Sequence, residues 1–233
     1  MKLGLMGDIH ANDHALEVVL AAAKSNAVSH LLITGDLVGY YYHPAKVLAL
    51  LKDWENKYIV LGNHEVMLKQ ARADLSYLQR ITQRYGHGLQ LALEALTFQQ
   101  LDELCNLPHP QPINISGRNI LLCHGSPWDN DIYIYPDTDL QIFDGFKVED
   151  FDLIVLGHTH YPMSKMIGNT LVVNPGSVGQ PRNRQPGAQW AIYDTDTNTV
   201  EFRCEAYDPT YLIHECIKND PELPYLHEVL TRT

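Results

Sequence analysis

The sequence predicts an α/β fold, a four-layer αββα sandwich with two mixed β-sheets. Short apolar runs rich in branched residues alternate with amphipathic helical segments up to about residue 156, as expected where helices cover buried strands. Strand-like runs then follow one another without helices between them, which indicates antiparallel additions to the sheets. Because strand-like sequence lies on both sides of a set of polar clusters, we expect two sheets packed face to face.

The first elements alternate between strands and helices. Five apolar runs are expected to be strands: Lys2–Met6, His30–Ile33, Tyr58–Leu61, Ile120–Cys123 and Leu153–Leu156. Leu16, Val19 and Leu20 share one face at helical spacing, which predicts a helix after the first run. Residues 44–54 repeat this pattern after the second run, so each helix can cover a face of a sheet.

The later elements are strands and turns. The expected strands are Met163–Ile167, Thr170–Val173, Trp190–Tyr193 and Val200–Cys204. Since no linker or repeat interrupts the chain, residues 1–233 are expected to form a single domain. Two helical additions are expected within it: an insert at about 65–104, broken only at Gly86 and Gly88, and a C-terminal tail at about 209–233. The insert is the one segment long enough to form a lid.

Composition limits the partners and the compartment. The chain has 28 acidic and 17 basic residues, and its net charge of −11 at pH 7 disfavours long duplex nucleic acid as a partner. The four cysteines are scattered, without the paired spacing of a zinc knuckle or a disulfide framework. The apolar run at the N-terminus, about five residues long, is too short for a signal peptide or a membrane span. We therefore expect a cytoplasmic protein with no membrane partner.

Polar clusters stand where the strand-like runs end. They are Gly7-Asp8-Ile9-His10, Gly35-Asp36, Gly62-Asn63-His64-Glu65, His124-Gly125 and Gly157-His158-Thr159-His160. Because the carboxyl ends of parallel strands lie along one rim of a sheet, these clusters are expected to converge. Glycine before the polar residues is expected to let the backbone turn sharply. Carboxylate, amide and imidazole ligands suit Mn²⁺, Fe²⁺ or Zn²⁺, and seven such side chains favour two ions over one.

Taken in order, the five clusters resemble the calcineurin-like metallophosphoesterase superfamily, whose pattern is Asp-x-His, Gly-Asp, Gly-Asn-His-Asp/Glu, a lone His and Gly-His-x-His. The segment Asn174–Gly179 is similar to a closing turn of the small bacterial and archaeal members. The resemblance covers about residues 1–204. It implies a di-metal-dependent phosphoric ester hydrolase, similar to the small bacterial and archaeal phosphodiesterases. The implied substrate is a small phosphate ester or a nucleotide-like molecule.

The resemblance also implies a role for each matching residue. One metal ion would be held by Asp8, His10, Asp36 and His160, and the other by Asp36, Asn63, His124 and His158, with Asp36 as the bridge. Such ions lie ~3.5–4 Å apart and lower the pKa of a shared water, which supplies a hydroxide nucleophile. His64 is the implied catalytic residue beside the leaving oxygen, and Asp8 or Glu65 is placed to orient it. Glu65 is otherwise an acid of a helix first turn.

Tyr40 and Arg182 are the candidate substrate-binding residues. Arg182 follows the Asn174–Gly179 turn and is either a bidentate partner of a phosphate or a solvated arginine. Tyr40 begins a run of three tyrosines after Asp36 that could stack on a base. His43, which follows that run, could face the substrate. The basic residues of the insert, Lys69, Arg72, Arg80 and Arg84, either turn toward a phosphate or form a solvated face.

Differences between this sequence and the motifs of individual branches of the superfamily disfavour some of the possible activities. Protein phosphatases and dinucleoside tetraphosphatases carry an arginine shortly after the second metal aspartate, whereas Asp36 is followed by Leu37-Val38-Gly39-Tyr40. Gly39 stands where cyclic-nucleotide diesterases often have an aspartate, and the chain lacks room for the DNA-binding part of the nuclease branch. Two alternatives stay open: a dinucleoside polyphosphate hydrolase, and a metal-binding, non-catalytic scaffold like the retromer subunit of this fold. Retention of His64 and all seven ligands favours the enzyme.

Overall fold

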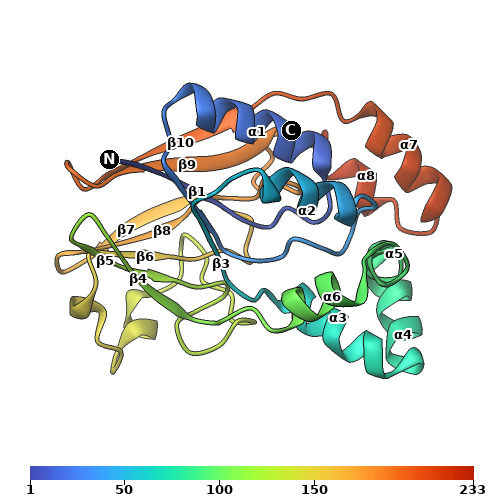
Figure 1. Cartoon of the computed structure of the whole chain (residues 1–233), viewed down its shortest axis with the longest axis horizontal. Coiled ribbons are helices and arrows are strands. Elements are labelled where there is room, and N and C mark those ends of the chain that lie inside the picture. The colour runs from blue at the N-terminus through green and yellow to red at the C-terminus, as the bar shows by residue number, and fades with distance from the viewer.

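A computed structural model describes the whole chain, residues 1–233, and contains two five-stranded sheets that pack face to face (Figure 1). In spatial order the first sheet consists of β10 (Thr199–Glu205), β9 (Ala188–Asp194), β1 (Lys2–Met6), β2 (His30–Ile33) and β3 (Lys57–Ile59). The second consists of β4 (Gln111–Ile115), β5 (Arg118–Leu122), β6 (Leu153–Val155), β8 (Thr170–Asn174) and β7 (Met163–Ile167). The expected pair of sheets is confirmed.

Both sheets are mixed. In the first, β1, β2 and β3 are parallel, β9 pairs antiparallel with β1, and β10 pairs antiparallel with β9 at the edge. In the second, β5, β6 and β8 are parallel, and β4 and β7 add antiparallel edges. Strand β4 was not predicted from the sequence. It contains Pro112, and it lies at the edge of its sheet, where a residue without a backbone N–H is tolerated.

Alternation along the strands builds the core between the sheets. Leu3 and Leu5 of β1 and Leu32 of β2 point toward the second sheet, where they join Ile120 and Val155 in one apolar cluster. All five are 0% exposed. Since neighbouring residues of a strand face opposite sides, the other face of the first sheet is free to pack against helices.

Helices α1 (Asp13–Ser25) and α2 (Pro44–Lys52) cover that outer face. Leu16 and Val19 of α1 pack with Trp190 of the sheet. The outer face of the second sheet is covered by the irregular segment 126–152, which includes two short 3₁₀ helices, Leu140–Phe143 and Val148–Asp150. The fourth layer of the sandwich is therefore largely a long connection.

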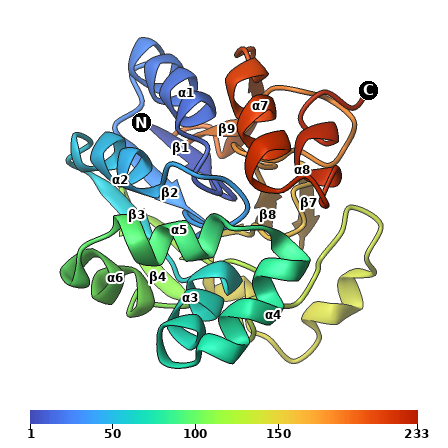
Figure 2. The same ribbon diagram turned by 90° about the vertical axis from the view of Figure 1, so that its right-hand side faces the viewer.

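The remaining helices lie together on one side of the molecule (Figure 2). Four of them connect β3 to β4: α3 (Asn63–Ala73), α4 (Leu75–Tyr85), α5 (Gly88–Ala95) and α6 (Phe98–Cys105). Besides the expected break at Gly86, the chain is interrupted at Asp74 and Thr97, whose side chains cap α4 and α6. No helix is both long and apolar enough to cross a membrane.

The C-terminal helices α7 (Thr210–Asn219) and α8 (Tyr225–Glu228) pack against the tyrosines that follow β2. Tyr41 Oη donates to the carbonyl of Leu226 at 3.1 Å, and Tyr42 Oη donates to Asp220 Oδ2 at 2.7 Å. These contacts tie the tail to the sandwich and support our proposal that residues 1–233 form one domain.

Candidate metal centre

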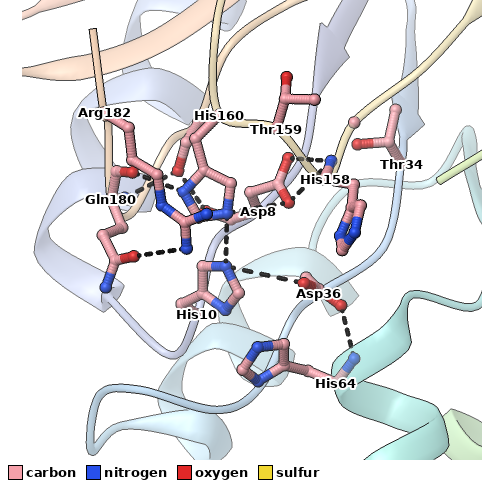
Figure 3. A network of polar contacts seen from close by, with 12 residues as sticks. Asp8, His10, Thr34, Asp36, His64, His158, Thr159, His160, Gln180 and Arg182 are labelled. Carbon is pink, nitrogen blue, oxygen red and sulfur yellow. Dashed lines mark hydrogen bonds and ion pairs between the residues drawn. The ribbon is translucent and has the colours of Figure 1, made fainter. Parts of the chain in front are cut away.

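The polar clusters that end the strands lie close together at one rim of the two sheets. Figure 3 shows the clusters that contain Asp8, Asp36, His64 and His158. The seven candidate metal ligands are Asp8, His10, Asp36, Asn63, His124, His158 and His160. Six of them are buried, and Asn63 is half-buried at the start of α3. The structure therefore brings together all the side chains that the sequence places in the metal centre.

One group is formed by Asp8, His10 and His160. Nε2 of His10 lies 3.1 Å from Nε2 of His160, which in turn lies 3.4 Å from Asp8 Oδ1. Nδ1 of His10 lies 3.2 Å from the Val38 carbonyl, and Nδ1 of His160 lies 2.6 Å from the Gln180 carbonyl. A carbonyl only accepts, so both Nδ1 atoms donate and both Nε2 atoms present lone pairs to the centre.

A second group is formed by Asp36, His124 and His158, with Asn63 beside it. Nε2 of His124 lies 3.4 Å from Asp36 Oδ2 and 3.0 Å from Asn63 Oδ1, while its Nδ1 faces the Thr34 carbonyl at 2.7 Å. Nε2 of His158 is buried and makes no hydrogen bond. This group thus has the same organisation as the first, with ring nitrogens directed inward.

The carboxylate of Asp36 stands between the two groups. Its Oδ2 lies 3.7 Å from Nε2 of His10 and 3.4 Å from Nε2 of His124. Its Oδ1 accepts a hydrogen bond from the backbone N–H of His64 at 2.9 Å. One side chain therefore contacts a histidine of each group.

The chemistry of this set fits divalent cations. Lone pairs of His10 and His160 that point at each other across 3.1 Å repel, and a cation between them removes that repulsion. Burial lowers the pKa of both rings, and it lowers the pKa of His158 to about 3, so these imidazoles are neutral donors at pH 7. His124 differs: burial opposes its charge, but Asp36, Asp8 and the Thr34 carbonyl together outweigh burial and raise its pKa to about 9. A cation bound there takes the place of that proton.

The ligands themselves make the tight turns of the site. Five of them have left-handed φ angles: Asp8 (51°), His10 (50°), Asp36 (53°), His158 (68°) and His160 (61°). Each such residue costs of the order of 1–3 kcal/mol and persists only where its surroundings hold it. The glycines before them were expected to make these turns, and for Gly7, Gly62 and Gly157 that expectation was wrong. These glycines allow close packing instead, since a Cβ on Gly7 would lie 1.7 Å from Thr34 Oγ1.

Glu65 holds the turn that carries Asp36. Its Oε1 accepts from Leu37 N at 2.8 Å and Val38 N at 3.3 Å. Its Oε2 accepts from Asp36 N at 2.9 Å and Gly62 N at 3.0 Å. Burial, together with the charge of Asp36, raises the pKa of Glu65 to about 7. The sequence suggested either a helix first-turn acid or a partner of His64, and it did not reveal this bond to a segment 29 residues away.

His64 lies beside Asp36 at the wall of a small pocket that also contains Tyr40 and Arg182. Its ring centroid is 4.7 Å from that of Tyr40 and 5.8 Å from that of Tyr85. Its Nδ1 is buried without a hydrogen bond, so neither Asp8 nor Glu65 orients the ring as the resemblance suggested. A Cβ on Gly39 would lie 2.0 Å from this Nδ1, so only glycine leaves room for the ring. Burial lowers the pKa of His64 to about 4.

Both candidate substrate-binding residues line this pocket. Arg182 Nη2 donates to Tyr40 Oη and to Gln180 Oε1, each at 3.1 Å, and its buried Nε has no partner. Arg182 is thus directed into the pocket rather than into solvent. Tyr133, which no sequence signal indicated, closes the opposite side with its ring centroid 3.9 Å from that of His158.

Other residues considered from the sequence lie outside the pocket. His43 Nδ1 is 2.6 Å from Asp13 Oδ1 and its Nε2 is 3.2 Å from Glu215 Oε1, so it links the start of α1 to α7. Within the insert, Lys69 donates to the Cys105 carbonyl, and Arg72 lies 3.8 Å from Asp102. These basic side chains therefore face away from the centre.

Comparison with known proteins agrees with this geometry. Residues 1–198 match the model of the calcineurin-like phosphoesterase superfamily domain. An uncharacterised protein of Methanocaldococcus jannaschii is 28% identical over an alignment of 235 positions, which covers 93% of this chain and 92% of that protein. The phosphodiesterase YfcE of Escherichia coli K12 is 24% identical over 212 residues, which cover 86% of this chain and 91% of YfcE.

The fold has a close counterpart among solved structures. A hypothetical protein of Pyrococcus horikoshii OT3 superposes with a TM-score of 0.86 at 23% identity, and the match covers 99% of this chain and 98% of that one. At this level of identity the likeness shows a common fold, which includes both sheets and the helices around them.

Because four backbone N–H groups donate to the Glu65 carboxylate, the isosteric change Glu65→Gln is predicted to lower stability. The new amide NH₂ would face two backbone N–H donors, so we expect the free energy of unfolding to fall by at least about 1–3 kcal/mol. Denaturant unfolding measures it. Glu94→Gln, at an exposed position of α5, is the matched control and should change stability by less than about 0.5 kcal/mol. Equal effects of the two variants would contradict a holding role for Glu65.

Proposed function

The chain belongs to the calcineurin-like phosphoesterase superfamily and is a metal-dependent phosphoester hydrolase, and from this premise we propose that it is a phosphodiesterase with a two-metal centre. The observation that carries the proposal is the position of Asp36, whose Oδ2 contacts a histidine of each ligand group. We assign Asp8, His10, Asp36 and His160 to one ion and Asp36, Asn63, His124 and His158 to the other. Oxygen and imidazole ligands suit Mn²⁺, Fe²⁺ or Zn²⁺.

The chemistry divides between the ions and the protein. When bound, the ions act as Lewis acids and lower the pKa of a coordinated water. Arg182 and Tyr40 bind the non-bridging phosphate oxygens, since the Arg182 guanidinium has an unpartnered Nε–H in the pocket. His64 assists the departing oxygen by donating a proton or stabilising its charge. Burial lowers the pKa of His64, and a bound phosphate anion opposes that shift by favouring the imidazolium.

The substrate is a small phosphate diester or a nucleotide-like molecule. The net charge of −11 repels a long duplex, and the helical insert stands beside the centre. A monoanionic diester also carries less charge into this acidic molecule than a dianionic monoester does. The dinucleoside polyphosphate hydrolase that the sequence left open would use the same centre, and the experiment below separates the two.

A substrate panel tests the proposed activity. With added Mn²⁺ we expect turnover of an aryl phosphodiester, slower turnover of the matching monoester, and none of linear duplex DNA at moderate salt. Chelation should abolish the activity and Mn²⁺ should restore it. Dinucleoside polyphosphates form the fourth arm, and preference for them would select the alternative. Efficient cleavage of duplex DNA would contradict the proposal that the substrate is a small molecule.

The proposed bridging role of Asp36 can be tested by measuring how many metal ions the protein binds. Asp36→Asn removes a charge from both ligand groups at once, so we expect one equivalent of metal or none in place of two. Elemental analysis of protein loaded with Mn²⁺ and then desalted gives the stoichiometry. Asp220→Asn, a buried aspartate outside the centre, serves as control. Two tightly bound equivalents in Asp36→Asn would refute the bridge.

His64 should matter most when the leaving group is poor. General-acid assistance contributes ~10²–10⁴-fold, and a good leaving group needs little of it. We therefore expect His64→Ala to keep its metals and to lose far more rate on an alkyl diester than on an aryl diester. His227→Ala, on α8, is the matched control. Equal losses on both esters would indicate a positioning role, and loss of metal would make His64 a ligand.

A further inference from the structure

A groove of about 590 Å³ opens beside the metal centre. Its floor includes Met67 and Gln70 of α3, one wall is a face of α4, and the opposite wall is the segment 130–133. Asn63, Tyr85 and Tyr133 line both this groove and the pocket that holds His64. The groove is therefore a direct extension of the metal centre, on the side where the His64 ring meets Tyr85.

The α4 wall carries two arginines without acidic partners. Tyr77, Arg80 and Arg84 recur at helical spacing and line the groove together. The Arg84 guanidinium lies 4.9 Å from the Tyr85 ring centroid, and that of Arg80 lies 5.6 Å from the Tyr77 centroid. Neither lies within 4.0 Å of a carboxylate, in contrast to Arg72 beside Asp102. In a chain with a net charge of −11, two such neighbouring arginines give this wall of the groove a local positive charge.

The opposite wall offers aromatic surface. Tyr133 is 45% exposed although one side of its ring packs on the metal-centre residue His158. Tyr135 stacks beside it, with centroids 5.7 Å apart and an angle of 14° between the rings. Half-exposed rings of this kind bind planar groups by stacking, which is sequence-tolerant for nucleobases.

Charges are ordered along the groove. Asp131 Oδ1 lies 3.5 Å from Nε2 of His158, at the metal end. Arg80 lies five residues before Tyr85 in α4. At a rise of 1.5 Å per residue, Arg80 is therefore ~7–8 Å further from the metal centre along the helix. A ligand that extends from the metal centre thus meets Asp131 first, then Tyr85 with Arg84 over its ring, and finally Arg80. This order favours an anionic group at the far end over one next to the scissile phosphate.

We propose that this groove is the subsite for the leaving group, and that the leaving group is a nucleoside that carries a second phosphate. Its base stacks against Tyr133 and Tyr85, and its second phosphate binds Arg80 and Arg84. The inference rests on the proposed phosphodiesterase function. It goes beyond that function because it names which part of the substrate is recognised and by which residues.

Two matched dinucleotides test the subsite. The products of TpT show which thymidine leaves, and a phosphate is then added to the free hydroxyl of that nucleoside. We expect the wild type to cleave the phosphorylated substrate with a kcat/KM at least about tenfold higher, which corresponds to ~1.4 kcal/mol, mainly through a lower KM. In Arg80→Gln/Arg84→Gln this ratio should fall to nearly one. Arg72→Gln, on the neighbouring α3, should keep the wild-type ratio.

A binding measurement separates the subsite from the activity. Thymidine 3′,5′-bisphosphate titrated into the metal-free protein should bind more tightly to the wild type than to Arg80→Gln/Arg84→Gln, by about tenfold, in isothermal calorimetry. Equal binding to both proteins, or a double variant that keeps the substrate ratio, would overturn the subsite. If no diester is turned over while this difference in binding persists, the proposed activity fails, and the groove is a nucleotide-binding site without a leaving-group role.

Discussion

The structure around the metal centre depends on one buried charge, the carboxylate of Asp36, which is 1% exposed. The free energy of burying a carboxylate without partners exceeds the stability of a typical domain, so neighbouring groups must stabilise the charge. Burial alone would raise the pKa of Asp36, but the nearby rings of His124, His64 and His10 outweigh it and hold the pKa well below its usual value. His10 follows β1 of the first sheet, and His124 follows β5 of the second. The same charge therefore fixes the rim of one sheet relative to the other.

The turns that carry the candidate ligands have strained, left-handed backbone conformations, and backbone hydrogen bonds offset this strain. The turns after β1 and β2 hold each other in left-handed conformations, because Asp8 N donates to the Gly35 carbonyl at 3.1 Å and His10 N donates to the Asp36 carbonyl at 2.9 Å. Glu65 completes the support with four backbone N–H bonds, at the cost of a second buried acid near Asp36. Burial and, after it, repulsion by the Asp36 carboxylate raise the pKa of Glu65. Cations bound at the centre offset the same repulsion, so metal affinity and local stability are linked.

Local pattern predicted the parts of this fold that depend on neighbours in sequence. The strands Lys2–Met6, His30–Ile33 and Met163–Ile167 have the bounds that alternation and apolar runs indicate. The polar clusters after the first two converge because these strands are parallel neighbours that share a rim. The role of Glu65 could not be found in this way, since three of its four partners lie 27–29 residues earlier in the chain. Tyr133 was missed for the same reason, as it packs on His158 from an irregular segment without periodicity. Strand β4 was missed because Pro112 argues against a strand unless its place at the edge is known.

Apart from Asn63, which belongs to both sets, the candidate metal ligands and the residues that line the groove come from different parts of the chain. The candidate ligands stand at strand ends, where the packing of two sheets determines their positions. The groove is built from α3, α4 and the segment 130–133, which are additions beside that rim. Changes in α4 or in the segment 130–133 leave the buried charge of Asp36 and its partners in place. Changes at the strand ends, or at the start of α3 where His64 and Glu65 lie, disturb them. A scaffold of this kind can keep one hydrolytic centre while the residues around it change to bind different leaving groups. In this chain, the arginines of α4 would determine which leaving group is bound.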